Sequence, residues 1–203
     1  MTTPADVRPP AWAELFLRLL LKRDDRDSVT GDLLEEYRDS IRPARGRWRA
    51  DAWYLMQVAG FAWRSAGVFG VLFAGSFLTR MAFDWFAPPA DFVFRSIVTT
   101  FTAVAIFTSA GALTAWRLRS VGAGALVGFT TGVIAAALTS IVALVVLAIW
   151  HDRQTMAAIA GSGGLNEVFT LPLLVTAPGT ICAALGAIAG KGLAWSLGSR
   201  LAE

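Results

Sequence analysis

The sequence is poor in the residues that enzymes and metal proteins use most. Among 203 residues it has one cysteine, Cys182, and one histidine, His151. A single cysteine excludes an internal disulfide, and it excludes cysteine-based zinc sites, which need two or more thiolates. Cys182 and His151 are too far apart in the sequence to suggest a nucleophile with its base. We therefore expect neither catalytic residues nor a metal site.

Charge is also scarce in most of the chain. Of 33 charged residues, 20 fall in the first 51 positions, and the remaining 152 positions carry 13. Hydrophobic residues make up 55% and the mean hydropathy is +0.55, whereas soluble domains average about 45–50% apolar residues. The sequence therefore predicts an all-α, polytopic membrane protein with a polar head and a lipid-embedded body. Residues 1–10 lack an apolar run, so we expect no signal peptide and a cytoplasmic N-terminus.

Two amphipathic helices are predicted in the head, residues 1–50. The first begins near Pro9-Pro10, because proline suits the first turn of a helix. Its apolar stripe is Trp12, Leu15, Phe16, Leu19 and Leu20. The second is expected over about 28–42, after an acidic interruption at 24–28, and packs on the first as a hairpin. Its apolar face is Val29, Leu33, Leu34, Tyr37 and Ile41, and its acids, Asp32, Glu35, Glu36 and Asp39, suit a solvated face better than a divalent cation site.

A row of arginines precedes an uncharged stretch with aromatic residues. Arg42, Arg45, Arg47 and Arg49 are followed by residues 52–63, which include Trp53. Arginine beside tryptophan is typical of the lipid headgroup region, where each base contributes roughly 1 kcal/mol on an anionic leaflet. We predict an interfacial helix over 51–64 that binds anionic lipids. Residues 1–51 carry ten bases and ten acids, which argues against nucleic acid as a partner.

Four transmembrane helices are expected in the region 65–203. The uncharged stretch of the first span is too short to cross the hydrocarbon core. We therefore extend this span past Arg80 and expect the Arg80 side chain to snorkel toward the headgroups. Pro172 and Pro178 should kink the last helix or unwind a turn. The predicted spans cover residues 65–83, 96–116, 120–150 and 168–190.

The loop charges predict the orientation. With four spans, the head, Arg117, Arg119, Lys191 and Arg200 fall on one side, which places both termini in the cytoplasm. The other side has no positive excess, with Arg80, Arg95 and Arg153 against Asp84, Asp91, Asp152 and Glu167.

Small residues recur at helical spacing in the third and fourth spans. Such ridges let membrane helices approach closely. They either hold the four helices together or present a surface to another protein, and the spacing does not distinguish the two. The predicted helix-packing residues are Gly124, Gly128, Gly132 and Ala136 in the third span and Gly179, Ala183, Gly186 and Gly190 in the fourth.

His151 is the one candidate cofactor ligand. It follows Trp150 at a predicted membrane edge, where it is either an interfacial polar residue or an axial ligand to haem iron or chlorophyll magnesium. We predict no other cofactor ligand. The sequence does not decide whether the protein binds lipid or pigment. Spans two to four carry no charge, which argues against an ion-coupled pump.

Residues 9–65 resemble a known bacterial module. The matching segments are Pro9-Pro10-Ala11-Trp12-Ala13-Glu14, Leu17-Arg18-Leu19-Leu20-Leu21, Gly31-Asp32-Leu33-Leu34-Glu35-Glu36-Tyr37, and Trp53-Tyr54 with Gln57. They are similar to the permease prefix domain, which precedes macrolide-exporter-like ABC permeases. The resemblance implies a bacterial origin and a helical cytoplasmic head that docks on the membrane or on a partner, and it assigns no catalytic residues. Those permeases continue for several hundred residues with a large periplasmic domain, so transport is not implied.

The sequence as a whole favours a non-catalytic subunit of the bacterial cytoplasmic membrane. We expect it to pack on other integral membrane subunits and to stabilise a larger complex, with respiratory and photosynthetic complexes as plausible examples. The alternative is a truncated permease-related protein that accompanies or regulates an ABC exporter.

Overall fold

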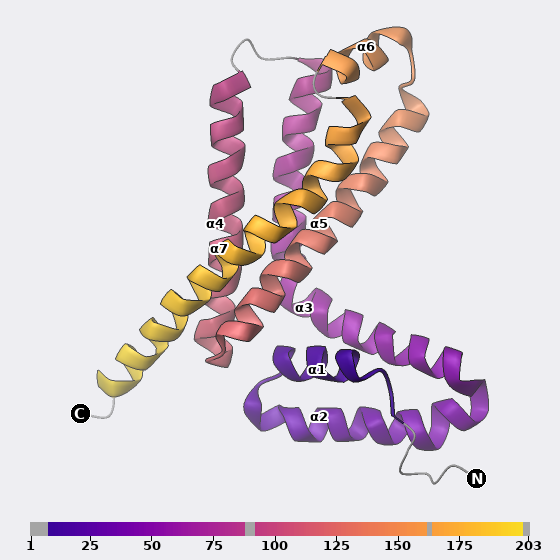
Figure 1. The fold of residues 1–203 in the computed structure, drawn as a ribbon, viewed down its shortest axis with the longest axis vertical. Coiled ribbons are helices and arrows are strands. Elements are labelled where there is room, and N and C mark those ends of the chain that lie inside the picture. Colours follow the sequence, from indigo (N-terminus) through magenta and orange to yellow (C-terminus); the bar gives the residue numbers. More distant parts are fainter. Residues whose placement is uncertain (1–7, 88–91, 162–163, 201–203) are drawn as a thin grey trace. The chain divides into compact units, whose positions relative to one another are not determined.

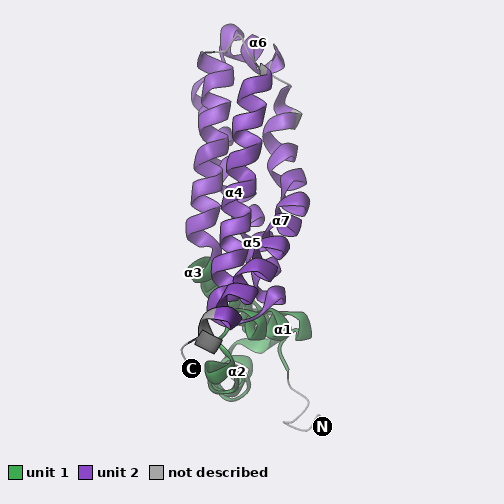
Figure 2. Ribbon diagram, turned by 90° about the vertical axis from the view of Figure 1, so that its left-hand side faces the viewer, with its two compact units in different colours: residues 1–65 green, residues 66–203 purple. Residues whose placement is uncertain are grey.

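A computed structural model describes residues 8–87, 92–161 and 164–200 of the chain. Almost all of these residues are helical, and none of them lies in a strand. The chain divides into two compact units, residues 1–65 and 66–203, which Figure 2 colours separately. Each unit is described by itself. Asp91, one of the predicted loop charges, and the side chain of Arg200 lie outside the description.

Unit 1 contains the predicted helical hairpin and the start of a long helix. Its elements are α1 (Ala11–Leu20), α2 (Arg23–Glu36), the π-helical turn η2 (Tyr37–Ile41) and the first part of α3 (Arg42–Phe86). The prediction that residues 24–28 interrupt the helices is wrong, since α2 begins at Arg23. Asp24 and Asp25 lie in its first turn, where acids stabilise a helix through its dipole.

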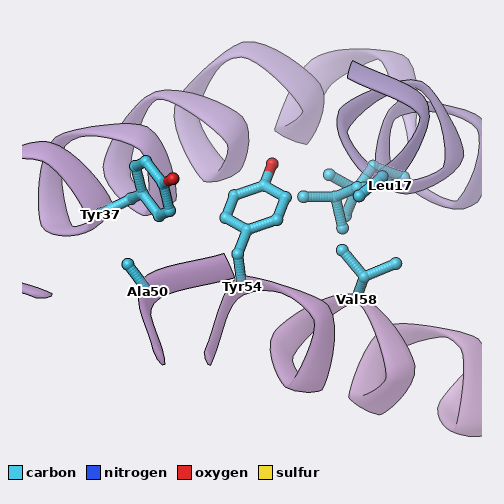
Figure 3. Close-up of a cluster of buried hydrophobic side chains, with 7 residues drawn as sticks. Leu17, Tyr37, Ala50, Tyr54 and Val58 are labelled. Carbon is cyan, nitrogen blue, oxygen red and sulfur yellow. The ribbon is translucent and has the colours of Figure 1, made fainter. Parts of the chain in front are cut away.

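The core of unit 1 is built around two tyrosines (Figure 3). Tyr37 and Tyr54 are both fully buried, and their rings meet edge to face with centroids 6.0 Å apart. The Tyr37 hydroxyl donates a hydrogen bond to Asp51 Oδ1 at 2.5 Å. Leu17 of α1 and Val58 of α3 complete this cluster, so α3 packs on the hairpin through one of its faces.

The core face of α1 differs from the predicted stripe. Ala13, Leu17 and Leu20 are buried, whereas Trp12 and Leu15 are each 61% exposed. The prediction assumed that α1 packs against one neighbour, α2. Because α1 also contacts Tyr54 and Val58 of α3, its buried stripe is rotated away from Trp12 and Leu15.

Unit 2 contains the remainder of α3 and four further helices (Figure 1). These are α4 (Phe92–Leu118), α5 (Val121–Ile149), the short α6 (Arg153–Gly161) and α7 (Gly164–Arg200). Four helical stretches of the described residues are long and apolar enough to cross a membrane, namely Arg23–Phe86, Val93–Leu118, Val121–Ile149 and Glu167–Ser196. This confirms the prediction of an all-helical protein with four candidate spans. Helix α7 contains Pro172 and Pro178 without interruption, so neither proline unwinds a turn.

The small-residue ridges of α5 and α7 face each other inside unit 2. A Cβ atom on Gly124, Gly128 or Gly132 would collide with Ala187, Ala183 or Thr176 of α7, respectively. Ala136, on the same ridge of α5, is 3% exposed. Of the two readings of this ridge, the structure therefore places it within the bundle and not on its outer surface.

The second ridge of α7 packs on α4. A Cβ on Gly186 would collide with the Thr108 carbonyl, and one on Gly190 with the Ala112 carbonyl. Gly179 lies against the ring of Phe107, and Ala183 is fully buried. Helix α7 thus contacts α5 and α4 through neighbouring ridges, at backbone-to-backbone distances that only small residues permit.

Gly46→Ala should destabilise unit 1, because Gly46 has φ 72° and ψ 171°, a conformation open essentially to glycine alone. Forcing alanine there costs about 1–3 kcal/mol. Gly60→Ala is the matched control, since Gly60 is helical with nothing within 4 Å of an added Cβ. Hydrogen–deuterium exchange of the amides around Tyr54 should accelerate in the first variant alone. Equal exchange in both variants would contradict the strained turn.

Gly128→Ala should weaken the α5–α7 contact by about 1–3 kcal/mol, because overpacking a tight interface forces the helices apart. Gly75→Ala makes the same chemical change on an exposed position of α3 with nothing within 4 Å, and it should change stability by less than about 0.5 kcal/mol. The measurement is unfolding of the purified protein in mixed micelles of increasing SDS content. Equal midpoints for the two variants would show that α5 and α7 are not in close contact.

Candidate functional site

Four charged side chains from three helices meet in unit 2. Arg80 Nε of α3 lies 3.6 Å from Asp84 Oδ2, one turn later on the same helix. Arg80 also donates a hydrogen bond to Glu167 of α7, and Arg95 of α4 forms an ion pair with Asp84. The side chains of Arg80, Asp84 and Arg95 are 15%, 7% and 14% exposed. We call Arg80, Asp84, Arg95 and Glu167 the charged cluster.

The helix ends explain why these residues meet. Arg95 lies near the start of α4 and Glu167 in the first turn of α7, while Arg80 and Asp84 lie near the end of α3. Because α3 and α4 run in opposite directions, all four reach the same end of the bundle (Figure 1). The guanidinium of Arg80 pairs with two acids within the unit, and its snorkelling toward the headgroups stays a prediction.

The charged cluster connects α3 to its neighbours. One ion pair joins α3 to α7 and the other joins α3 to α4. Removing one partner of a buried ion pair leaves the other charge poorly compensated. The resulting loss of folding free energy is larger than the contribution of a typical surface ion pair. The cluster is electrically balanced, with two bases and two acids, so it offers no net charge to a ligand.

A groove follows the seam between α3 and α4. It has a volume of about 470 Å³. Two of its hydroxyls are satisfied within their own helices: Thr79 donates to the Gly75 carbonyl, and Thr102 donates to the Val98 carbonyl. Arg80 and Arg95 of the charged cluster also line the groove. The full lining is Ser76, Thr79, Arg80, Phe83, Phe94, Arg95, Val98, Thr99 and Thr102.

A second, smaller cavity lies between α3, α4 and α7, with a volume of about 210 Å³. Phe73 and Phe107 line it and meet edge to face, with ring centroids 5.1 Å apart. Cys182 also lines it and packs against the same apolar cluster, as a small apolar residue does. Voids on the seam mean that α4 packs less tightly on α3 than on α7.

His151 is exposed, between the end of α5 and the start of α6. Its neighbour Asp152 caps α6: Oδ1 accepts hydrogen bonds from the Gln154 and Thr155 amides, and Oδ2 accepts one from the Thr155 hydroxyl. The hydrogen bonds from Thr155 lower the pKa of Asp152 below its usual range. Both carboxylate oxygens are thus used in the cap, where they do not orient the imidazole for a metal.

The residues predicted to contact lipid headgroups separate into two groups. Arg45, Arg47 and Arg49 are exposed and Arg42 is half-buried. Trp53 is half-buried, packs against the unit 1 core, and has its ring centroid 6.5 Å from that of Tyr54. The exposed tryptophans nearby are others: Trp48 is 87% exposed and Trp63 is 51% exposed.

The four acids predicted to form a solvated face lie in α2 and η2. Asp32, Glu35, Glu36 and Asp39 are all exposed. Within residues 8–87, 92–161 and 164–200, no three His, Cys, Asp or Glu side chains gather in a way that would hold a metal ion.

Sequence reasoning missed the charged cluster as a site. Its four members fall in two separate loops of the predicted topology. The available signal was the presence of both signs of charge at one membrane level, because opposite charges at the same level are free to pair. Seven charged residues are predicted on the outer side. Which of them form pairs depends on the rotation of each helix about its axis, and the loop sequences do not determine this rotation.

Comparison with protein-family models, with curated proteins and with solved structures finds no match to this chain. The resemblance of residues 9–65 to the permease prefix domain therefore stays a prediction.

Asp84→Asn should destabilise unit 2 by about 2–3 kcal/mol, because Arg95 loses its Asp84 carboxylate and Arg80 keeps one acid of two. Glu14→Gln is the control: it breaks the 2.9 Å pair with Arg18, which is half exposed, and should cost less than about 0.5 kcal/mol. The unfolding midpoint in SDS-containing micelles, read by tryptophan fluorescence, compares the two. An equal effect of both substitutions would mean that the cluster is solvated and does not hold α3.

Proposed function

We propose that this protein is a non-catalytic integral membrane subunit that packs on, and stabilises, a larger membrane protein complex. The observation that carries the proposal is the groove between α3 and α4. In this proposal the groove receives a transmembrane helix of another subunit. Energy-transducing complexes, respiratory or photosynthetic, are plausible hosts.

The lining of the groove supports a helix as its occupant. Membrane helices associate through close packing of small residues and through hydroxyl groups. The groove lining includes the hydroxyl residues Ser76, Thr79 and Thr102, and Val98 lies one helical turn before Thr102 on α4. Acyl chains gain nothing from such hydroxyls, whereas a helix with small or polar residues can pack on them and donate hydrogen bonds to their oxygens.

The glycine ridges are not available as the surface for a partner helix. They are the obvious helix-packing surfaces of the sequence, yet they are occupied by contacts among α4, α5 and α7. A partner helix must therefore use a different surface. The α3–α4 seam suits this role because one ion pair and one ring contact bridge it, while voids separate its remaining length.

The proposed location is the bacterial cytoplasmic membrane, with both termini in the cytoplasm. Arg117 in the last turn of α4, Arg119 between α4 and α5, and Lys191 of α7 lie at the end of unit 2 opposite the charged cluster. A positive excess marks the cytoplasmic side, so the charged cluster would lie near the outer side. A permease-related companion of an ABC exporter is the competing proposal, and the partner's identity separates the two.

The test is site-specific photo-crosslinking in native membranes. A benzoylphenylalanine at Val98, 48% exposed in the groove, should form one product of fixed stoichiometry with another membrane protein, identified by mass spectrometry. The control position is Leu185 of α7, which is 62% exposed and outside the groove lining. It should give lipid adducts only.

The partner then decides the class of function. A respiratory or photosynthetic subunit crosslinked at Val98 supports the proposal. An ABC ATPase or permease supports the competing one. Lipid adducts alone at Val98, or the same products at Val98 and Leu185, would contradict a helix in the groove.

A further inference from the structure

The first part of α3 has a second apolar face, opposite the one that packs on the hairpin. Residues Ala50, Tyr54 and Val58 face the unit 1 core. Half a helical turn away, a run of exposed residues recurs at intervals of three and four along the same helix. Its members are Trp48, Ala52, Met56, Ala59, Gly60 and Trp63, and we call it the outer face of α3.

The outer face is too apolar for a surface in water. Trp48, Met56 and Trp63 are 87%, 64% and 51% exposed, and the small residues between them carry no polar side chain. A soluble helix with one buried face places charged residues on the other. Here both faces of the helix are apolar, so the outer face of α3 requires an apolar surface of its own.

The charged residues around the outer face indicate which kind of surface it contacts. Between Arg42 and Arg64 the chain has five arginines and one acid, Asp51. Asp51 is turned toward the core, where it accepts the Tyr37 hydrogen bond and lies 3.8 Å from Arg47 Nε. Arg45 and Arg49, near one end of the outer face, and Arg64, at the other end, are exposed. An acid-free apolar face with arginines at both ends is complementary to an anionic surface.

The tryptophans indicate a lipid surface. Trp48 and Trp63 are separated by 15 residues, which is about 22 Å along a helix, and they lie at the two ends of the outer face. Tryptophan is enriched at the membrane–water boundary, and basic helices with tryptophan on the apolar side lie in the plane of the interface.

We propose that the outer face of α3 lies on the anionic leaflet of a bilayer. In this arrangement Trp48, Met56 and Trp63 enter the boundary between headgroups and acyl chains, and Arg45, Arg49 and Arg64 contact lipid phosphates. The proposal replaces Trp53, which packs on the core, with Trp48 and Trp63 as the lipid-contacting tryptophans. It is independent of the partner proposed for the α3–α4 groove.

The test measures how deeply the outer face enters lipid. The full chain carries Cys182→Ala, so that a spin label attaches only to a cysteine introduced by Met56→Cys or Gly60→Cys. At Gly60 nothing lies within 4 Å of an added Cβ, so the label has room. The control is Glu35→Cys on the exposed acidic side of α2. The protein is reconstituted in lipid nanodiscs with or without phosphatidylglycerol, and collision rates with oxygen and with a water-soluble nickel chelate are compared.

The expected result is a severalfold higher ratio of oxygen to nickel collisions at positions 56 and 60 than at position 35. Removing phosphatidylglycerol, or substituting Arg45, Arg49 and Arg64 with glutamine, should lower that ratio at positions 56 and 60 and leave position 35 unchanged. Nickel access at position 56 equal to that at position 35 would overturn the proposal. So would immobilised labels shielded from both reagents, because they would indicate a protein surface.

Discussion

The close approach of α7 to α4 and α5 is the contact on which unit 2 depends. Gly124, Gly128 and Gly132 of α5, and Gly186 and Gly190 of α7, lie where a Cβ atom would meet a neighbouring helix. Because lipid is as apolar as these helices, burial of apolar side chains supplies little driving force, and dispersion between close backbones must supply it. The three helices therefore form a tightly packed centre.

Helix α3 has one glycine contact with this centre, Gly70 against Ile134 of α5, and is otherwise attached in a different way. It uses large side chains, such as Phe73 against Phe107, and the ion pairs of the charged cluster. Large side chains and salt bridges act over longer interhelical distances than glycine contacts, and they leave the groove of about 470 Å³ along the α3–α4 seam. The same chemistry that fixes α3 thus produces the surface that we propose for a partner helix.

Much of this arrangement follows from sequence patterns. Charge depletion after residue 51 predicts the membrane class, and the spacing of Gly124, Gly128 and Gly132 predicts a close helix contact, because both depend on local composition. The rotation of each helix depends on all of its neighbours. For this reason the core face of α1, the burial of Trp53 and the pairing of Arg80 with Glu167 could not be read from one helix at a time.

The central claim is that the α3–α4 groove is a binding surface for a transmembrane helix. Electron cryo-microscopy of the protein, extracted with its surrounding membrane in polymer discs, tests the claim most directly. The account predicts density for a helix of another subunit against Val98 and Thr102, with α3 held away from α4. Acyl-chain density alone in the groove, or α3 closed directly onto α4, would contradict it.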